Sequence, residues 1–124
     1  MEKIALDTSL CIAMLKDADF GQKFTDSFAV QKPCLPSVAA FELLLRTYSV
    51  DEVQIFINKT EIIALDEAAA RISAQISNDL RKKGATISTN DVFIAATAMA
   101  NNCGLATLNV KDFSKIKGLK LVKL

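Results

Sequence analysis

The chain has 124 residues, 51% of them hydrophobic, and 15 basic and 14 acidic side chains give it a formal net charge of +1 at pH 7. This composition supports a packed core and argues against disorder, while the near balance of charge excludes a globally basic nucleic-acid-binding protein. The chain has no histidine, which argues against Cys/His zinc coordination and histidine-based acid–base catalysis. We expect one domain over residues 1–124.

Short apolar segments alternate with helical patterns along the chain. In the first half of the chain the pattern predicts a strand at 4–6, a helix ending near residue 16, a helix over 19–30, an extended segment at 33–36, and helices over 37–48 and 51–58. In the second half it predicts a strand at 62–65, helices from 66 to 82 and from 89 to 101, a strand at 105–107, a helical turn at 110–115 and a strand at 119–122. We expect the N-caps to be Thr8 or Ser9, Ser37, Asp66 and Thr89. Gly84 follows two lysines, which is the expected end of a helix.

Strands that alternate with helices indicate an α/β fold, a three-layer α/β/α sandwich with a short, mostly parallel central sheet. In such sheets a ligand binds at the carboxyl ends of the strands. Asp7 directly follows the first predicted strand, and Asn109 and Asp112 follow the strand at 105–107. We therefore expect the site at this edge of the sheet.

Three acidic residues, Asp7, Glu42 and Asp91, lie within apolar sequence, where a carboxylate is costly to bury without a positive partner. Each also has an ordinary explanation. Asp7 suits a helix N-cap, Asp91 suits the first turn of a helix, and Glu42 suits a salt bridge with Arg46 four residues later. If the three acids converge, they repel one another, and hard oxygen ligands without soft ones favour Mg²⁺ or Mn²⁺.

Two further groups of residues complete the inventory. The cysteines Cys11, Cys34 and Cys103 are widely spaced in apolar surroundings and are expected to be buried, reduced thiols. Residues 111–124 carry five lysines and one acid, and we favour their role as soluble edge residues of a terminal strand over phosphate contact. No signal peptide and no apolar run long enough to cross a bilayer is apparent, which predicts a cytoplasmic protein without a membrane partner.

Four segments of the chain resemble the signature blocks of PIN-domain ribonucleases, in particular the VapC-like toxins of prokaryotic type II toxin–antitoxin pairs. They are residues 6–9 (Leu-Asp-Thr-Ser), 36–37 (Pro-Ser) with 42–43 (Glu-Leu), 90–98 (Asn-Asp-Val-Phe-Ile-Ala-Ala-Thr-Ala) and 105–113 (Leu-Ala-Thr-Leu-Asn-Val-Lys-Asp-Phe). The resemblance covers essentially the whole chain and includes Arg81 and Gly84 before the third block and 117–119 near the end.

The resemblance implies that Asp7, Glu42 and Asp91 bind one or two Mg²⁺ or Mn²⁺ ions. It also implies hydroxyl support from residues that are Thr8, Ser9 and Thr107 in this chain. Many members carry Asp where this chain has Asn109, which supplies no charge, so the first metal site is implied more firmly than the second. Asp112 is an alternative to Asn109 at this position.

The implied reaction is hydrolysis of single-stranded or looped RNA that leaves a 5′-phosphate. The family also implies a homodimer and a cognate antitoxin, whose peptide crosses the site and offers an arginine to the carboxylates.

Three other interpretations remain. A housekeeping RNA-processing PIN nuclease would lack a neighbouring antitoxin gene, and a catalytically silent PIN-like binding module would lack metal-dependent cleavage. A phospho-receiver-like domain would need an early pair of acids, whereas Asp7 stands alone.

Overall fold

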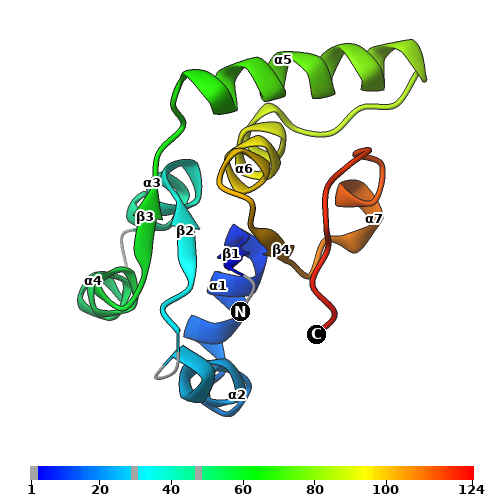
Figure 1. Cartoon of the computed structure of the whole chain (residues 1–124). Coiled ribbons are helices and arrows are strands. Elements are labelled where there is room, and N and C mark those ends of the chain that lie inside the picture. The colour runs from blue at the N-terminus through cyan, green and yellow to red at the C-terminus, as the bar shows by residue number, and fades with distance from the viewer. Residues whose placement is uncertain (1–2, 29–30, 47–48) are drawn as a thin grey trace.

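A four-stranded sheet, parallel throughout, forms the centre of the computed structural model, which describes residues 3–28, 31–46 and 49–124. The strands are β1 (Ile4–Leu6), β2 (Cys34–Pro36), β3 (Glu61–Ile63) and β4 (Gly104–Ala106). They lie in the order β3-β2-β1-β4 (Figure 1). The register pairs Ala5 of β1 with Cys34 on one side and with Leu105 on the other.

Seven helices are found within the described residues, and they connect and cover the strands. They are α1 (Thr8–Lys16), α2 (Ala18–Phe28), α3 (Ser37–Leu44), α4 (Val50–Asn58), α5 (Glu67–Lys82), α6 (Thr89–Ala100) and α7 (Val110–Phe113). The predicted α/β class and the parallel sheet are therefore confirmed. No described helix has the length and apolar character that a membrane-spanning segment needs.

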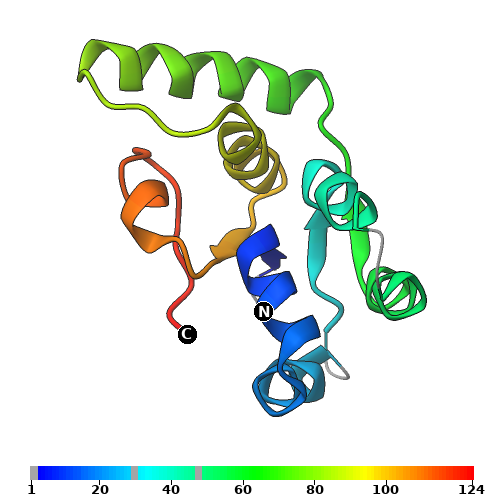
Figure 2. The ribbon, with the colours of Figure 1, turned by 180° about the vertical axis from the view of Figure 1, so that it is seen from behind.

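The sheet is covered on both faces, as the predicted three-layer arrangement requires. Helix α6 lies on the face nearer the viewer in Figure 1, and α1 lies on the face nearer the viewer in Figure 2. Helix α5 packs along the outer side of α6. The core between these layers is mainly aliphatic, and its largest fully buried apolar side chains include Leu10, Leu35, Leu43, Ile94, Leu105 and Phe113.

The order of the strands reverses at β1. The chain moves from β1 to β2 to β3 in one direction, and then returns across the sheet through α5 and α6 to place β4 on the other side of β1. This reversal leaves a crevice position at the carboxyl ends of β1 and β4, where α/β proteins bind ligands. Asp7 follows β1 and Thr107 follows β4, so both lie at this switch point.

The local signals for helix ends agree with the structure at some positions and not at others. Asp66 caps α5 by accepting a hydrogen bond from the Ala69 amide at 3.0 Å, and Gly84 follows the end of that helix at a φ of 69°, both as expected. The cap of α6 is Ser88 rather than Thr89, since the Ser88 hydroxyl accepts from the Asp91 amide. Ser37 does not precede α3 but begins it, and its hydroxyl accepts from the Leu65 amide instead.

The ends of several predicted elements differ from the structure or lie outside it. Strand β3 covers Glu61–Ile63 rather than 62–65, β4 covers Gly104–Ala106 rather than 105–107, and α7 ends at Phe113 rather than at residue 115. Helix α3 ends at Leu44, and the predicted end at Tyr48 lies outside the described residues, as does the end of the second helix at Val30. The strand predicted at 119–122 is reduced to a single parallel bridge between Leu105 and Leu121. Residues 120–122 pair only with Leu105, because the amide and carbonyl of Leu105 are the pair that the short strand β4 leaves free on this side.

Candidate active site

Asp7 is the most deeply buried acid of the site, with only 3% of its surface exposed. It occupies the N-cap position of α1, yet its side chain makes no capping hydrogen bond. Instead its Oδ2 atom accepts hydrogen bonds from the Thr107 hydroxyl at 2.6 Å and from the Ser9 hydroxyl at 2.7 Å. Asp7 therefore stands at the N-cap position, but its carboxylate caps no backbone amide and is held by one hydroxyl of α1 and one that follows β4.

Thr107 and Ser9 tie the end of β4 to the start of α1. Thr107 is 2% exposed, and its hydroxyl oxygen accepts from the Asn109 amide at 2.9 Å while its hydrogen goes to Asp7. The Ser9 hydroxyl oxygen accepts from the Leu108 amide at 3.3 Å and lies 3.4 Å from the Thr107 hydroxyl. The two hydroxyls fix both the Asp7 carboxylate and the loop that follows β4.

Glu42 is half-buried on α3, which packs against both α1 and α6. Its Oε1 atom accepts a hydrogen bond from the Thr8 hydroxyl at 2.7 Å. The two residues lie 34 positions apart in the chain, so only the packing of α3 against α1 brings them together. Neither Thr8 nor Ser9 caps α1 as predicted, because both hydroxyls are used by acids of this site.

Asp91 lies in the first turn of α6 and is partly buried. Burial raises the pKa of its carboxyl above the ordinary value, and the negative charges of Asp7, Glu42 and Asp112 raise it further. The side-chain hydrogen bond between Asp91 and Ser88 acts in the opposite direction and lowers the pKa of the Asp91 carboxyl. Asp7 and Glu42, the other two acids singled out from the sequence, therefore both lie within electrostatic reach of Asp91.

The loop after β4 brings a fourth polar group to the same edge. The Asn109 amide nitrogen Nδ2 donates to Asp112 Oδ2 at 3.2 Å, and the Lys115 ammonium lies 3.4 Å from Asp112 Oδ1. The hydrogen bond from Asn109 and the charge of Lys115 hold the pKa of the Asp112 carboxyl below its ordinary value. Asp112 is thus paired with Lys115, whereas Asn109 contributes no charge to the site.

The carboxylate oxygens of Asp7, Glu42 and Asp91 are hard ligands of the kind that a divalent cation such as Mg²⁺ binds. No ammonium or guanidinium of the described residues lies within 4 Å of Asp7 or Asp91, so their negative charge is not compensated by an ion pair. Within those same residues, no three acids or cysteines are close enough to form a ready-made metal cage. Mg²⁺ typically binds through one or two carboxylates and keeps several waters, so an open carboxylate edge of this kind suits it.

Two contacts of this site were not predicted from the sequence. Ser88 bonds the Asp91 backbone, and Lys115 pairs with Asp112. The Ser88 position could have been found from its spacing, since a serine three residues before an acid in a helix start is a common cap pattern. The pairing of Lys115 with Asp112 could have been found in the same way, from their i,i+3 spacing.

Comparison with known proteins identifies the fold and the family. The PIN domain family model matches residues 4–119. The tRNA(fMet)-specific endonuclease VapC of Shigella flexneri is 26% identical over 97% of this chain and 96% of its own length. Ribonuclease VapC1 of Rickettsia felis is 53% identical over a shorter match, which spans 40% of this chain and 37% of that protein.

A solved structure agrees with this result. The crystal structure of DNA-bound VapBC from Salmonella typhimurium matches 98% of this chain and 98% of its own with a TM-score of 0.86 and 25% identity. The chain therefore belongs to the PIN domain family. Within that family it is VapC-like, and its named relatives are ribonucleases. Dependence on a divalent metal is a general property of PIN nucleases.

Proposed function

We propose that this chain is a divalent-metal-dependent endoribonuclease and the toxin of a toxin–antitoxin pair. The observation that carries the proposal is the placement of Asp7, buried at the tip of β1 and held by two hydroxyls, within electrostatic reach of Asp91. A structural acid in this position would be expected to meet a basic residue. An uncompensated pair of acids at a sheet switch point is instead suited to a cation and a phosphodiester.

Each acid has a proposed role. Asp7 and Asp91 hold Mg²⁺ or Mn²⁺, since neither makes an ion pair among the described residues and the charge of one acts on the other. Glu42 is either a third ligand or the base that orients the attacking water, and Thr8 fixes its carboxylate for that task. Asn109 holds a bound water through its side-chain oxygen, while Asp112 is occupied by Asn109 and Lys115 and orients the loop.

The cation, when bound, polarises a phosphoryl oxygen and lowers the pKa of a water molecule. The protein's own contribution is to keep the carboxylates in place. Ser9 and Thr107 fix the Oδ2 atom of Asp7, which leaves the Oδ1 atom for a ligand. Asp91 has a raised pKa in the metal-free protein, so part of its binding energy for a cation comes from relief of repulsion.

Partners of this chain are proposed from its relatives and its surface. An antitoxin is proposed because VapBC complexes share the fold, and RNA is the substrate because the relatives are named ribonucleases. A protein partner could cover exposed apolar side chains on α3, just after α3, and on α4. They include Phe41, Leu44, Leu45 and Ile55. A homodimer, a cytoplasmic location and one PIN-like domain over residues 1–124 remain part of the proposal.

Cleavage of a mixed RNA pool by the purified chain tests the enzyme. We expect cutting with Mg²⁺ or Mn²⁺ that leaves 5′-phosphate ends, stops with EDTA, returns when metal is added and is lost in Asp7→Asn. A folded protein that cuts no RNA with either metal would contradict the proposal and would favour the silent binding module.

Expression in a bacterial host tests the toxin role separately. We expect growth arrest from the wild-type chain, no arrest from Asp7→Asn, and rescue by co-expression of the gene next to it. Active nuclease that leaves growth unchanged would favour a housekeeping RNA-processing enzyme instead.

A further inference from the structure

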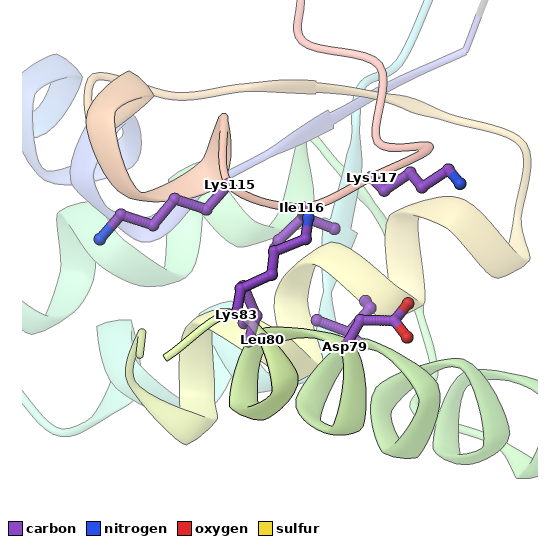
Figure 3. Close-up of a pocket in the computed structure, with 7 residues that line it drawn as sticks. Asp79, Leu80, Lys83, Lys115, Ile116 and Lys117 are labelled. Carbon is purple, nitrogen blue, oxygen red and sulfur yellow. The ribbon is translucent and has the colours of Figure 1, made fainter. Parts of the chain in front are cut away.

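A small hollow lies between the last turns of α5 and the segment that follows α7 (Figure 3). Three lysines line it: Lys83 from the end of α5, and Lys115 and Lys117 from the segment after α7. The apolar side chains of Leu80 and Ile116, both buried, form part of its wall. The hollow therefore combines a rigid apolar base with three cationic side chains.

The charges of this hollow are unequal. Asp79 is the one acid that lines it, against three lysines. Among the described residues no carboxylate oxygen lies within 4 Å of the ammonium of Lys83 or of Lys117. Two exposed lysines, Lys83 and Lys117, are thus left without an ion pair among the described residues and are available to an anionic partner.

The hollow is continuous with the carboxylate edge through Lys115. This lysine pairs with Asp112, which accepts a hydrogen bond from Asn109. The Asn109 backbone amide in turn bonds the hydroxyl of Thr107, which donates to Asp7. A chain of contacts therefore links Asp7 to Lys115, which lines the hollow together with Lys83 and Lys117. The acids attract the cation that chemistry requires, while the lysines would attract the anion that carries the scissile bond.

The directions of the lysine side chains indicate which kind of anion fits. In Figure 3 the ammonium groups of Lys115 and Lys117 point to opposite sides of the hollow, and Lys83 lies between them. They do not converge on one point, as they would around a single phosphate ion. Charges that are spread along a surface suit a polymer with phosphates at intervals, such as single-stranded RNA.

The alternative role predicted for these lysines, the protection of a sheet edge, does not apply to two of them. The strand predicted at 119–122 forms only the bridge at Leu121. Residues 120–122 pair with Leu105 of β4. Lys115 and Lys117 precede that segment. Gly118, at a φ of 87°, then turns the chain from Lys117 toward β4, so Lys117 is set apart from the edge.

We propose that the hollow lined by Lys83, Lys115 and Lys117 docks the backbone phosphates of the RNA that lie next to the scissile bond. The inference rests on the proposed function and specifies how that site holds its substrate. Lys115 lies nearest the acids, and Lys83 and Lys117 contact phosphates further along the strand. Contacts of this kind position RNA without reading its sequence.

The test uses the variant Lys83→Gln/Lys117→Gln, which removes two charges that make no ion pair among the described residues. Lys115 is left intact because of its contact with Asp112. The matched control is Lys16→Gln/Lys59→Gln, which removes the same charge from exposed positions at the far ends of α1 and α4. Both variants are compared with the wild-type chain on a long single-stranded RNA and on a short one that spans only the cleaved bond.

We expect the hollow variant to raise KM for the long RNA about 10-fold at low salt while kcat stays unchanged, since phosphate contacts contribute binding rather than chemistry. The salt dependence of log(kcat/KM) should flatten by about 1.4, or roughly 0.7 for each phosphate that the removed lysines would neutralise. The short RNA and the control variant should show neither change. Equal salt slopes for the hollow variant and the wild type, or equal losses in the control, would overturn the proposal.

A separate measurement keeps this inference distinct from the nuclease itself. Binding of fluorescent single-stranded RNA is followed in EDTA, where no cleavage occurs. If the wild type cuts no RNA but binds it with a slope that flattens only in the hollow variant, the docking site stands and the nuclease assignment fails. If the wild type cuts RNA and the slopes do not differ, the reverse holds.

Discussion

At the carboxyl edge of the sheet, Asp7 is buried, and the negative charges of Asp7 and Glu42 both act on Asp91. At the amino edge of the same four strands, Glu61 is exposed and accepts a hydrogen bond from the Cys34 thiol at 3.6 Å. The charges near Cys103 at that edge are mixed, since Lys3 lowers its pKa and Glu61 raises it.

The two edges are built from the same strands, so the difference in buried charge between them does not come from the fold itself. The carboxyl edge tolerates buried, repelling acids, which reduces stability unless a cation binds. The amino edge keeps its acid, Glu61, exposed to water. A stability cost that is confined to one edge indicates that this edge is kept for function.

The largest expected effect comes from removing an acid at each edge in turn. Asp7→Asn should lower kcat/KM for RNA by about 1,000-fold, because the loss of charge at the cation costs several kcal/mol in the transition state. Glu61→Gln, the matched change at the amino edge, should leave kcat/KM within about 2-fold, as ordinary for an exposed position. Initial rates of cleavage with saturating metal measure both; a similar loss in the two variants would break the comparison.

Removing the hydroxyl of Thr107 that supports Asp7 should have the next largest effect. Thr107→Val keeps the shape of the side chain but removes the hydroxyl that donates to Asp7 and accepts from Asn109. Loss of such support for a metal ligand typically costs about 10- to 100-fold in activity or metal affinity.

The control is Thr97→Val on α6, whose buried hydroxyl bonds, among the described residues, the Phe93 carbonyl of its own helix. Titration of the metal during cleavage measures the apparent affinity. The interpretation of Thr107 fails if both threonine variants shift that affinity alike.

Binding of metal should stabilise the carboxyl edge specifically. At about 100 times its Kd, Mg²⁺ or Mn²⁺ should raise the free energy of unfolding of the wild type by about 2.7 kcal/mol. Asp91→Asn should lose most of this gain, whereas Glu61→Gln should retain it. Thermal or urea unfolding with and without metal gives the comparison, and an equal gain in Asp91→Asn would exclude Asp91 as a ligand.

A smaller and opposite effect is expected without metal. Because the folded-state pKa of Asp91 is raised, the folded protein loses stability as pH rises from the ordinary aspartate pKa of about 3.9 through the raised value. Asp91→Asn removes that loss. It should therefore be more stable than the metal-free wild type at neutral pH by up to about 1 kcal/mol, the scale of partly exposed charges.

Urea unfolding in EDTA across this pH range measures the difference. The difference between Asp91→Asn and the wild type should shrink as pH falls toward the ordinary aspartate pKa. A wild type that is the more stable protein at neutral pH in EDTA would mean that Asp91 has a stabilising partner.

The smallest effect concerns the thiols, of which two lie at the amino edge. Burial raises the pKa of Cys34 to about 12 and also raises the pKa of Cys103 and Cys11 above the ordinary value. The three cysteines are free and buried, as the sequence predicted. We expect almost no alkylation by iodoacetamide at pH near 7.5 in the native protein, where the thiolate is scarce.

Mass spectrometry after timed labelling, with the urea-unfolded chain as the reactive reference, measures this. Rapid labelling of one cysteine in the native protein would reveal an opening of the amino edge that the structure does not show.

Local chemistry determined much of what was predicted correctly. Apolar runs bounded by turn residues indicated β1 and β3, the cap at Asp66 indicated the start of α5, and Gly84 indicated its end. Such signals depend on residues within a few positions of each other, so they can be read from the chain alone. The three candidate acids were also singled out from the sequence, because a carboxylate in an apolar segment needs an explanation wherever the segment folds. Their role in the site stays a prediction.

Tertiary structure decided the contacts between distant residues. Thr8 and Ser9 have the local features of helix caps, yet they donate to Glu42 and Asp7, and Thr107 reaches Asp7 across 100 positions of the chain. The terminal lysines suggested a protected strand edge, but the strand forms only a bridge, and Lys115 and Lys117 instead line a hollow together with Lys83. The sequence supplies the groups and their local preferences, and the packing of α1, α3 and α6 around β1 decides which of them meet.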